Sequence, residues 1–243
     1  EKSESHFLQT LDISRAAKLP IGEANALGNL GLIQVLRGET DESERLPLES
    51  LRLHREAGYR LGETNQLGNL GNVYRERRDL DRAEESYANA AVIHVELNNR
   101  AGEANALANR GIVLMERRDF RQAEHHLSNA LSIQRDIGDR LGEARQLGNL
   151  GNAKASQGKL DEAERLHLQS LSISRAVGNR LSQAQDLFNL SVVLVRQGRR
   201  DEACEQLLDA KALVDEIGAR GRGPEAVQAA IERLGCKDEP ADD

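Results

Sequence analysis

The hexapeptide LGNLGN occurs twice in this chain, at residues 67–72 and again at residues 147–152, and a shorter form, LGNLG, lies at residues 27–31. Glycine and asparagine each cost roughly 0.5–1 kcal/mol against alanine inside a helix. The residues around the motif nevertheless have the apolar spacing of a helix. Because the motif returns at multiples of forty residues, its recurrence indicates that the chain is built on one repeat.

A gap-free period of forty residues runs through the chain, and residues 61–100 and 141–180 show it most clearly. Residues 1–20 match the second half of a unit. We therefore expect a half unit at 1–20, full units at 21–60, 61–100, 101–140, 141–180 and 181–220, a capping helix at 221–235 and a disordered acidic tail at 236–243. Such a period predicts a solenoid, in which each unit buries its apolar face against its neighbours.

Each unit is expected to contain two helices. Leu67, Leu70, Gly71 and Tyr74 fall on one helical stripe, and a second stripe begins at Ala83. Glycine or asparagine follows the second stripe, in LNNR at 97–100 and IGDR at 137–140, where a helix stop favours a left-handed residue. Strand-like alternation is absent. The pattern predicts an all-α fold of antiparallel helix pairs, with no strand within residues 21–220.

The spacing Leu67-x2-Leu70-Gly71-x2-Tyr74…Ala83-x3-Tyr87 resembles the tetratricopeptide repeat, with leucine at the usual tryptophan position. The forty-residue form is similar to the arrays of Partner-of-Inscuteable and kinesin light chain, and to bacterial arrays of this repeat. The resemblance implies a right-handed superhelical solenoid whose first helices line a concave groove. It also implies a protein or peptide partner.

The asparagines lie on the side of each first helix opposite its packing stripe, at 100° per residue. An asparagine amide carries both a donor and an acceptor, so it can bind the main chain of an extended peptide. In related arrays such a ladder of asparagines grips the ligand backbone. By this resemblance we expect the peptide-binding residues to be Asn29, Asn65, Asn69, Asn72, Asn105, Asn109, Arg145, Asn149, Asn152 and Asn189. A purely structural role, in which the asparagines bond to a neighbouring helix, stays open.

Composition excludes several function classes. A net charge of −7 argues against a nucleic-acid partner, and no apolar run approaches the roughly 18 residues of a membrane span. There is no phosphate loop, zinc-ligand spacing or nucleophile elbow, so we expect no catalytic residue, metal ligand or cofactor, and no enzyme. Two cysteines in 243 residues fit a reducing compartment, which predicts a cytoplasmic location.

Two functional classes remain. The first is a scaffold that binds an extended peptide segment of a partner protein. The alternative is an oligomerisation or regulatory module of a larger signalling protein, with no free ligand. Self-association through the open N-terminal end of the stack would belong to this second class.

Several single residues carry expectations of their own. Pro47 should kink the second helix of the first full unit. The arginines that recur every forty residues should end each second helix; they are Arg60, Arg100, Arg140, Arg180 and Arg220. Glutamates three residues on, at Glu63, Glu103 and Glu143, are their expected partners. His54 and His94 are expected on a helix surface. Cys204 and Cys236 should lie close together, and the sequence leaves open whether they are bonded.

Overall fold

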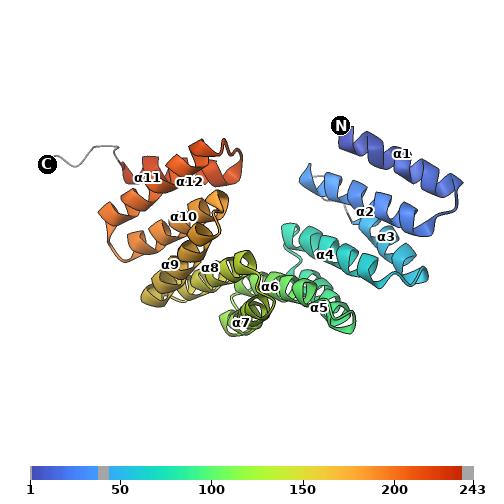
Figure 1. Ribbon diagram of the computed structural model, residues 1–243, viewed down its shortest axis with the longest axis horizontal. Coiled ribbons are helices and arrows are strands. Elements are labelled where there is room, and N and C mark those ends of the chain that lie inside the picture. The colour runs from blue at the N-terminus through green and yellow to red at the C-terminus, as the bar shows by residue number, and fades with distance from the viewer. Residues whose placement is uncertain (1, 38–43, 237–243) are drawn as a thin grey trace. The chain divides into compact units, whose positions relative to one another are not determined.

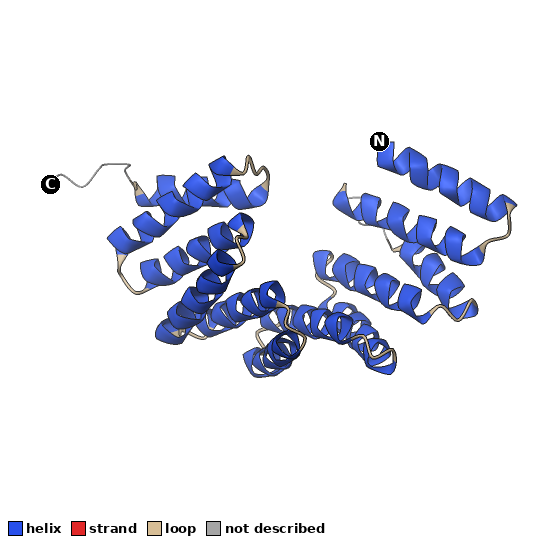
Figure 2. Ribbon diagram, viewed as in Figure 1, coloured by secondary structure: helices blue, strands red, loops and turns tan. Residues whose placement is uncertain are grey.

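The protein is all-α. The computed structural model describes residues 2–37 and 44–236, and over these ranges it contains helices and no strand (Figure 2). The helices are α1 (Lys2–Ala16), α2 (Pro20–Leu36), α3 (Arg45–Glu56), α4 (Arg60–Glu76), α5 (Leu80–Glu96), α6 (Arg100–Glu116), α7 (Phe120–Asp136), α8 (Arg140–Ser156), α9 (Leu160–Ala176), α10 (Arg180–Arg196), α11 (Arg200–Glu216) and α12 (Arg222–Leu234). The disordered tail expected at 236–243 lies outside the described residues, apart from Cys236.

A strict half-period of twenty residues governs the helices. The helices α4 to α11 each have 17 residues, and their starts are spaced by twenty residues. A left-handed residue ends each of these helices; examples are Arg78 (φ 62°), Asn98 (51°), Gly138 (73°) and Gly158 (79°). The next amide then bonds back across the turn, as Asn99 N does to His94 O at 2.9 Å. This confirms the predicted helix stops at Asn98 and Gly138.

The chain forms two compact units, residues 1–133 and residues 134–243, and we describe each by itself. Within a unit each helix packs against the helices before and after it in the chain (Figure 1). In the first unit α4 packs on α5 and α5 on α6. In the second unit α8 packs on α9, α9 on α10, α10 on α11 and α11 on α12. The short turns make consecutive helices antiparallel, as the sequence predicts.

The second glycine of the LGNLGN motif allows the two helices of a pair to approach closely. A Cβ atom on Gly71 would lie 2.6 Å from the ring of Tyr87 in α5. Gly111 stands in the same relation to Leu127, and Gly151 to His167, each at 2.7 Å. Since real Cβ contacts are not this short, each glycine forms a seat for one large side chain of the second helix.

A second glycine seat lies in the first turn of the first helices α2, α4, α6 and α8 and receives the preceding helix. A Cβ atom on Gly62 would lie 2.5 Å from the His54 ring, and one on Gly102 would lie 2.3 Å from that of His94. Gly68, the first glycine of the motif in α4, is different, because nothing lies within 4 Å of a Cβ placed there.

Three expectations from the sequence are wrong. Pro47 lies in the first turn of α3, which begins at Arg45, so no helical hydrogen bond is lost and no kink is required. Arg60 and its successors at 100, 140 and 180 begin first helices rather than ending second helices, because the left-handed residue ends the preceding helix two positions earlier. His54 is fully buried, because it fills the seat at Gly62.

The ion pairs predicted for these arginines are confirmed. Arg60 donates to Glu63 at 2.5 Å and Arg100 donates to Glu103 at 2.6 Å, and Arg140 pairs with Glu143. A cation at a helix N-terminus opposes the helix dipole. The glutamate in the same first turn compensates for it.

The two cysteines do lie close together. Cys204 in α11 and Cys236, just beyond α12, form a disulfide with Cα atoms 5.3 Å apart. The bond ties α12 to the second helix of the last full unit.

Gly68→Ala and Gly71→Ala are matched changes three residues apart in α4, and we expect opposite effects on the free energy of unfolding. Gly68→Ala should raise it by up to ~1 kcal/mol, because alanine is the better helix former and the site is open. Gly71→Ala should lower it by about 1–2 kcal/mol, because overpacking against Tyr87 outweighs that gain. Urea denaturation followed by circular dichroism measures both. An increase for Gly71→Ala would show that the seat is not tight.

Candidate functional site

An asparagine-lined cavity opens between α4 and α6 in the first unit. Its volume is about 440 Å³. Five predicted peptide-binding residues form its walls: Asn65, Asn69 and Asn72 from α4, and Asn105 and Asn109 from α6. Tyr87, Ala90 and His94 of α5 also line it. We call this cavity the asparagine trough. The structure thus brings half of the ten predicted residues into one concavity.

The amides of the trough are accessible. Asn65 and Asn105 are exposed, and Asn69 and Asn109 are partly exposed. Asn69 Nδ2 donates to Gln66 Oε1 in its own helix at 3.3 Å, which leaves its oxygen available. Among the described residues, the Asn109 side chain has no hydrogen-bond partner. The trough therefore presents amide donors and acceptors that the fold does not fully use.

Asn72 has a structural function that the sequence analysis did not identify. Its Oδ1 accepts a hydrogen bond from the buried Tyr87 hydroxyl at 2.7 Å. Burial also raises the pKa of Tyr87 to about 12, so the hydroxyl stays a donor. The sequence signal that could have indicated this bond is the tyrosine in the packing stripe, because a buried hydroxyl needs a hydrogen-bond partner.

Asn29 lies on α2 and is exposed, and it does not line the trough. Beside it, a Cβ atom on Gly28 would lie 2.3 Å from the Gln66 amide. The Gln66 side chain thus extends from α4 to α2, and its Oε1 accepts a hydrogen bond from Asn69. In this unit Asn69 therefore also supports the contact between successive first helices.

The second unit repeats the pattern on α8 and α10. Asn149 donates to Gln146 at 3.1 Å, and Asn189 accepts from Gln185 at 3.1 Å. Arg145 and Asn152 are exposed. Asn69, Asn149 and Asn189 thus bond within their own first helices. Asn72 differs, because it bonds to Tyr87 of the neighbouring helix α5, which is the structural role that the sequence left open.

Asp186 is a buried acid that the sequence analysis missed. It is 6% exposed and accepts hydrogen bonds from Ser170 at 2.7 Å and Ser174 at 2.8 Å, both in α9. Burial raises its pKa to about 6, although the two serines favour the ionised form. The signal was the residue series at this repeat position, Ala26, Gln66, Ala106, Gln146 and Asp186, in which only one member is charged.

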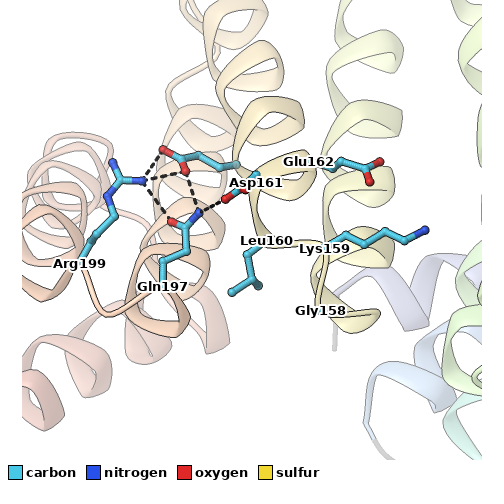
Figure 3. A pocket seen from close by; sticks show the side chains of 8 residues that line it. Gly158, Lys159, Leu160, Asp161, Glu162, Gln197 and Arg199 are labelled. Atoms are coloured by element: carbon cyan, nitrogen blue, oxygen red, sulfur yellow. Dashed lines mark hydrogen bonds and ion pairs between the residues drawn. The ribbon is translucent and has the colours of Figure 1, made fainter.

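A larger cavity of about 660 Å³ lies at the helix turns of the second unit (Figure 3). Arg199 donates to both oxygens of Glu164 at 2.8 Å, and Gln197 donates to Asp161 at 3.1 Å and to Glu164 at 3.0 Å. Lys159 and Glu162 point away from this network in Figure 3. Since its central polar groups bond to each other, the network joins neighbouring repeats.

The same joint recurs in the first unit with other donors. Glu44 accepts from Tyr74 at 2.9 Å and from Arg77 at 2.5 Å. Glu84 accepts from Arg110 at 2.9 Å and from Arg117 at 2.7 Å. Glu44, Glu84 and Glu164 occupy one repeat position, and we call these contacts the glutamate joints.

A family model described as tetratricopeptide repeat matches the chain three times, at residues 63–136, 102–176 and 141–216. The chain belongs to the tetratricopeptide repeat family. The matches together span more than half of its length, and they agree with the helix pairs and the glycine seats. No curated protein matches this tetratricopeptide repeat chain.

Solved structures share the fold at low sequence identity. BtubC (BKLC) from P. vanneervenii is 20% identical, with a TM-score of 0.70 over all of this chain and 95% of that one. A putative kinesin light chain with nearly identical TPR-like repeats, from Podosopora anserina, is 15% identical, with a TM-score of 0.65 over 83% of this chain and 99% of that one. A Rap protein complexed with Competence and Sporulation Factor is 13% identical, with a TM-score of 0.70 over 96% of this chain and 75% of that one.

Two kinds of feature are absent from the described residues. No helix there has the length and apolar character needed to cross a membrane. Over the same ranges, no group of three or more His, Cys, Asp or Glu side chains could hold a metal ion.

Two buried groups in the second unit should give opposite pH dependences of stability. Burial lowers the pKa of His167 to about 4, so its contribution is lost as the pH falls from 6.5 toward 4. Asp186 has a raised pKa, so its ionisation lowers stability as the pH rises from 3.8 toward 6. The two effects nearly cancel over this window.

Single variants should expose each effect. When the pH falls from 6.5 to 4, the free energy of unfolding of Asp186→Asn should fall by on the order of 2 kcal/mol more than that of the wild type. Over the same range the free energy of unfolding of His167→Leu should fall by on the order of 2 kcal/mol less than that of the wild type. Leucine occupies the His167 position in two other units, as Leu127 and Leu207. The measurement is urea denaturation across the pH range, with exposed His125→Gln as the control. Parallel pH profiles for all four proteins would contradict the assignment.

Proposed function

We propose that this tetratricopeptide repeat protein is an interaction scaffold that holds an extended segment of a partner protein by its main chain in the asparagine trough. The observation that carries the proposal is the cavity itself. Five asparagines on two successive first helices converge on one space of about 440 Å³. The cytoplasmic location expected from the cysteine count stays a prediction.

The chemistry of the trough suits a peptide backbone. An extended chain alternates N–H donors and C=O acceptors, and each asparagine amide can meet either group. Neither charge nor a large apolar wall selects particular side chains here. Recognition of this kind tolerates many ligand sequences, and it depends on the peptide being extended.

The openness of Gly68 supports the same reading. Nothing lies within 4 Å of a Cβ built there, and Gly68 itself lines the trough. Its helix-propensity cost is not explained by packing, in contrast to Gly71. A close approach of ligand backbone would explain it.

Each asparagine should contribute modestly, roughly 0.5–1.5 kcal/mol per net hydrogen bond. Several must therefore act together to hold a ligand. The solved structure of the Rap protein is a complex with Competence and Sporulation Factor. This complex supports the proposal that the chain is an interaction scaffold. The detailed proposal rests on the residues of this chain.

A ligand peptide is first selected from a displayed library with the intact chain as the target. Asn109→Ala should weaken binding of this peptide by about three- to tenfold. The melting temperature should not change, because the Asn109 side chain has no partner among the described residues. Asn89→Ala is the matched control, since Asn89 is exposed on α5 and does not line the trough. Fluorescence anisotropy measures affinity and calorimetry measures melting.

A second arm tests main-chain recognition directly. Replacing single amides of the selected peptide by esters removes one N–H donor at a time and leaves its side chains unchanged. Ester analogues should bind the wild type more weakly, and at one position the loss should disappear with Asn109→Ala. Full affinity for every ester analogue would exclude the proposed mode of binding.

Self-association through α1 is the second candidate. Ile13 in α1 is 66% exposed, whereas its successors Ile93, Ile133 and Ile173 are 5–8% exposed. The face of α1 that other second helices bury is therefore open. A second copy covering this face would place Ile13 in a contact.

Ile13→Glu should then convert an associated wild type into a monomer in light scattering after size-exclusion chromatography, because an unpaired charge would be buried. Leu168→Glu on α9 is the control, because the side chain at this repeat position is exposed in both α9 and α3. A wild type that stays monomeric at high concentration would rule out this association.

A further inference from the structure

Few contacts hold α12 in the second unit. It buries Val227 (4% exposed) and Ile231 (8%) against a cluster that includes Leu187 and Leu207. Arg200 also donates to the carbonyl of Leu234. By comparison, α10 buries five apolar side chains: Ala184, Leu187, Leu190, Val193 and Leu194. The Cys204–Cys236 bond is therefore a large part of what holds α12 in place.

The disulfide stands where a glutamate joint would stand. Cys204 lies forty residues after Glu164, at the same repeat position. Cys236 lies one residue short of the position forty residues after Gln197, a partner of Glu164. The last joint of the array thus has a covalent bond that can be reduced, where other joints have ion pairs and hydrogen bonds that no reductant affects.

An apolar cavity depends on the position of α12. Its volume is about 280 Å³, and its lining comes from α10 (Leu181, Phe188), α11 (Val214) and α12 (Pro224, Val227). If α12 leaves, this cavity is lost. The apolar faces of α10 and α11 that α12 covers then meet solvent.

We propose that the Cys204–Cys236 disulfide is a redox latch on α12. In the oxidised protein α12 is docked and the apolar cavity is intact. In the reduced protein α12 undocks reversibly and exposes the cluster around Leu187 and Leu207, while the other helices stay folded. The inference is independent of peptide binding in the asparagine trough.

The redox step needs a dithiol as co-reactant. A thiolate of the dithiol attacks one protein sulfur and forms a mixed disulfide, and the other cysteine leaves as a thiolate. The second thiol of the reagent then releases the first cysteine. The protein gains two electrons and two protons, and the dithiol becomes a cyclic disulfide. Both cysteines are partly exposed, which gives the reagent access.

The size of the effect follows from loop closure. The bond joins residues 32 apart in sequence. Removing a cross-link of this span should shift the equilibrium between docked and undocked α12 by roughly a hundredfold or more.

Hydrogen exchange of the wild-type chain, with and without dithiothreitol, tests the latch. Amides of residues 226–234 should exchange roughly a hundredfold faster after reduction, and those of α8 and α9 should not change. An environment-sensitive apolar dye, bis-ANS, should bind more strongly to the reduced protein. Cys204→Ser/Cys236→Ser should behave like the reduced wild type and should not respond to dithiothreitol.

Two results would overturn the proposal. Equal exchange of α12 in both redox states would show that its apolar contacts suffice without the bond. Faster exchange throughout α8–α12 on reduction would show that the disulfide holds the whole unit together and does not act on α12 alone.

Discussion

Close approach of helices at glycine is the contact on which the architecture depends. In the first four pairs the seat of the Gly71 type receives one large side chain, and the seat of the Gly62 type receives a side chain of the preceding helix; α10 has Ser182 and Ser191 at these positions. In those four pairs the two seats fix where the first helix meets the helices on either side of it. With helices of equal length and left-handed stops twenty residues apart, the same contact can recur without adjustment. The helix-propensity cost of glycine is therefore offset by packing, which is worth more in a solenoid whose units are stable only together.

The fold could be predicted because its determinants are periodic. The forty-residue spacing, the stripe through Leu67 and Tyr74, and the stops at Asn98 and Gly138 are all readable in one dimension. Errors arose where a residue's role depends on which neighbour it meets. A helical wheel gives His54 a face, but not the glycine seat that buries it. Arg60 was assigned to the wrong helix because the turn is only three residues long.

The candidate site was predictable in part for the same reason. Asn65, Asn69 and Asn109 lie opposite the packing stripes of their helices, so the sequence predicts that they share one face. The structure places them around one cavity. Their individual bonds were not predictable, since the Tyr87 hydroxyl and the Gln66 amide are the groups that engage Asn72 and Asn69. Asp186 was missed because its burial depends on Ser170 and Ser174 in the preceding helix. The asparagines thus divide into those the fold uses and those, such as Asn109, that it leaves available.

The joints between repeats show why some positions vary freely and others do not. A glutamate at one repeat position accepts from a tyrosine and an arginine at Glu44, from two arginines at Glu84, and from an arginine and a glutamine at Glu164. Any donor of suitable reach serves, because partly exposed polar contacts depend little on one geometry. The glycine seats vary less: glycine occupies the Gly71 position in the first four first helices, where an added Cβ would collide with the side chain in the seat, and serine replaces it only in α10, as Ser191. The periodic glycines are therefore visible in the sequence, whereas the partners of the glutamates are not. At the last joint this tolerance extends to a cysteine pair, which makes the attachment of one helix sensitive to reduction.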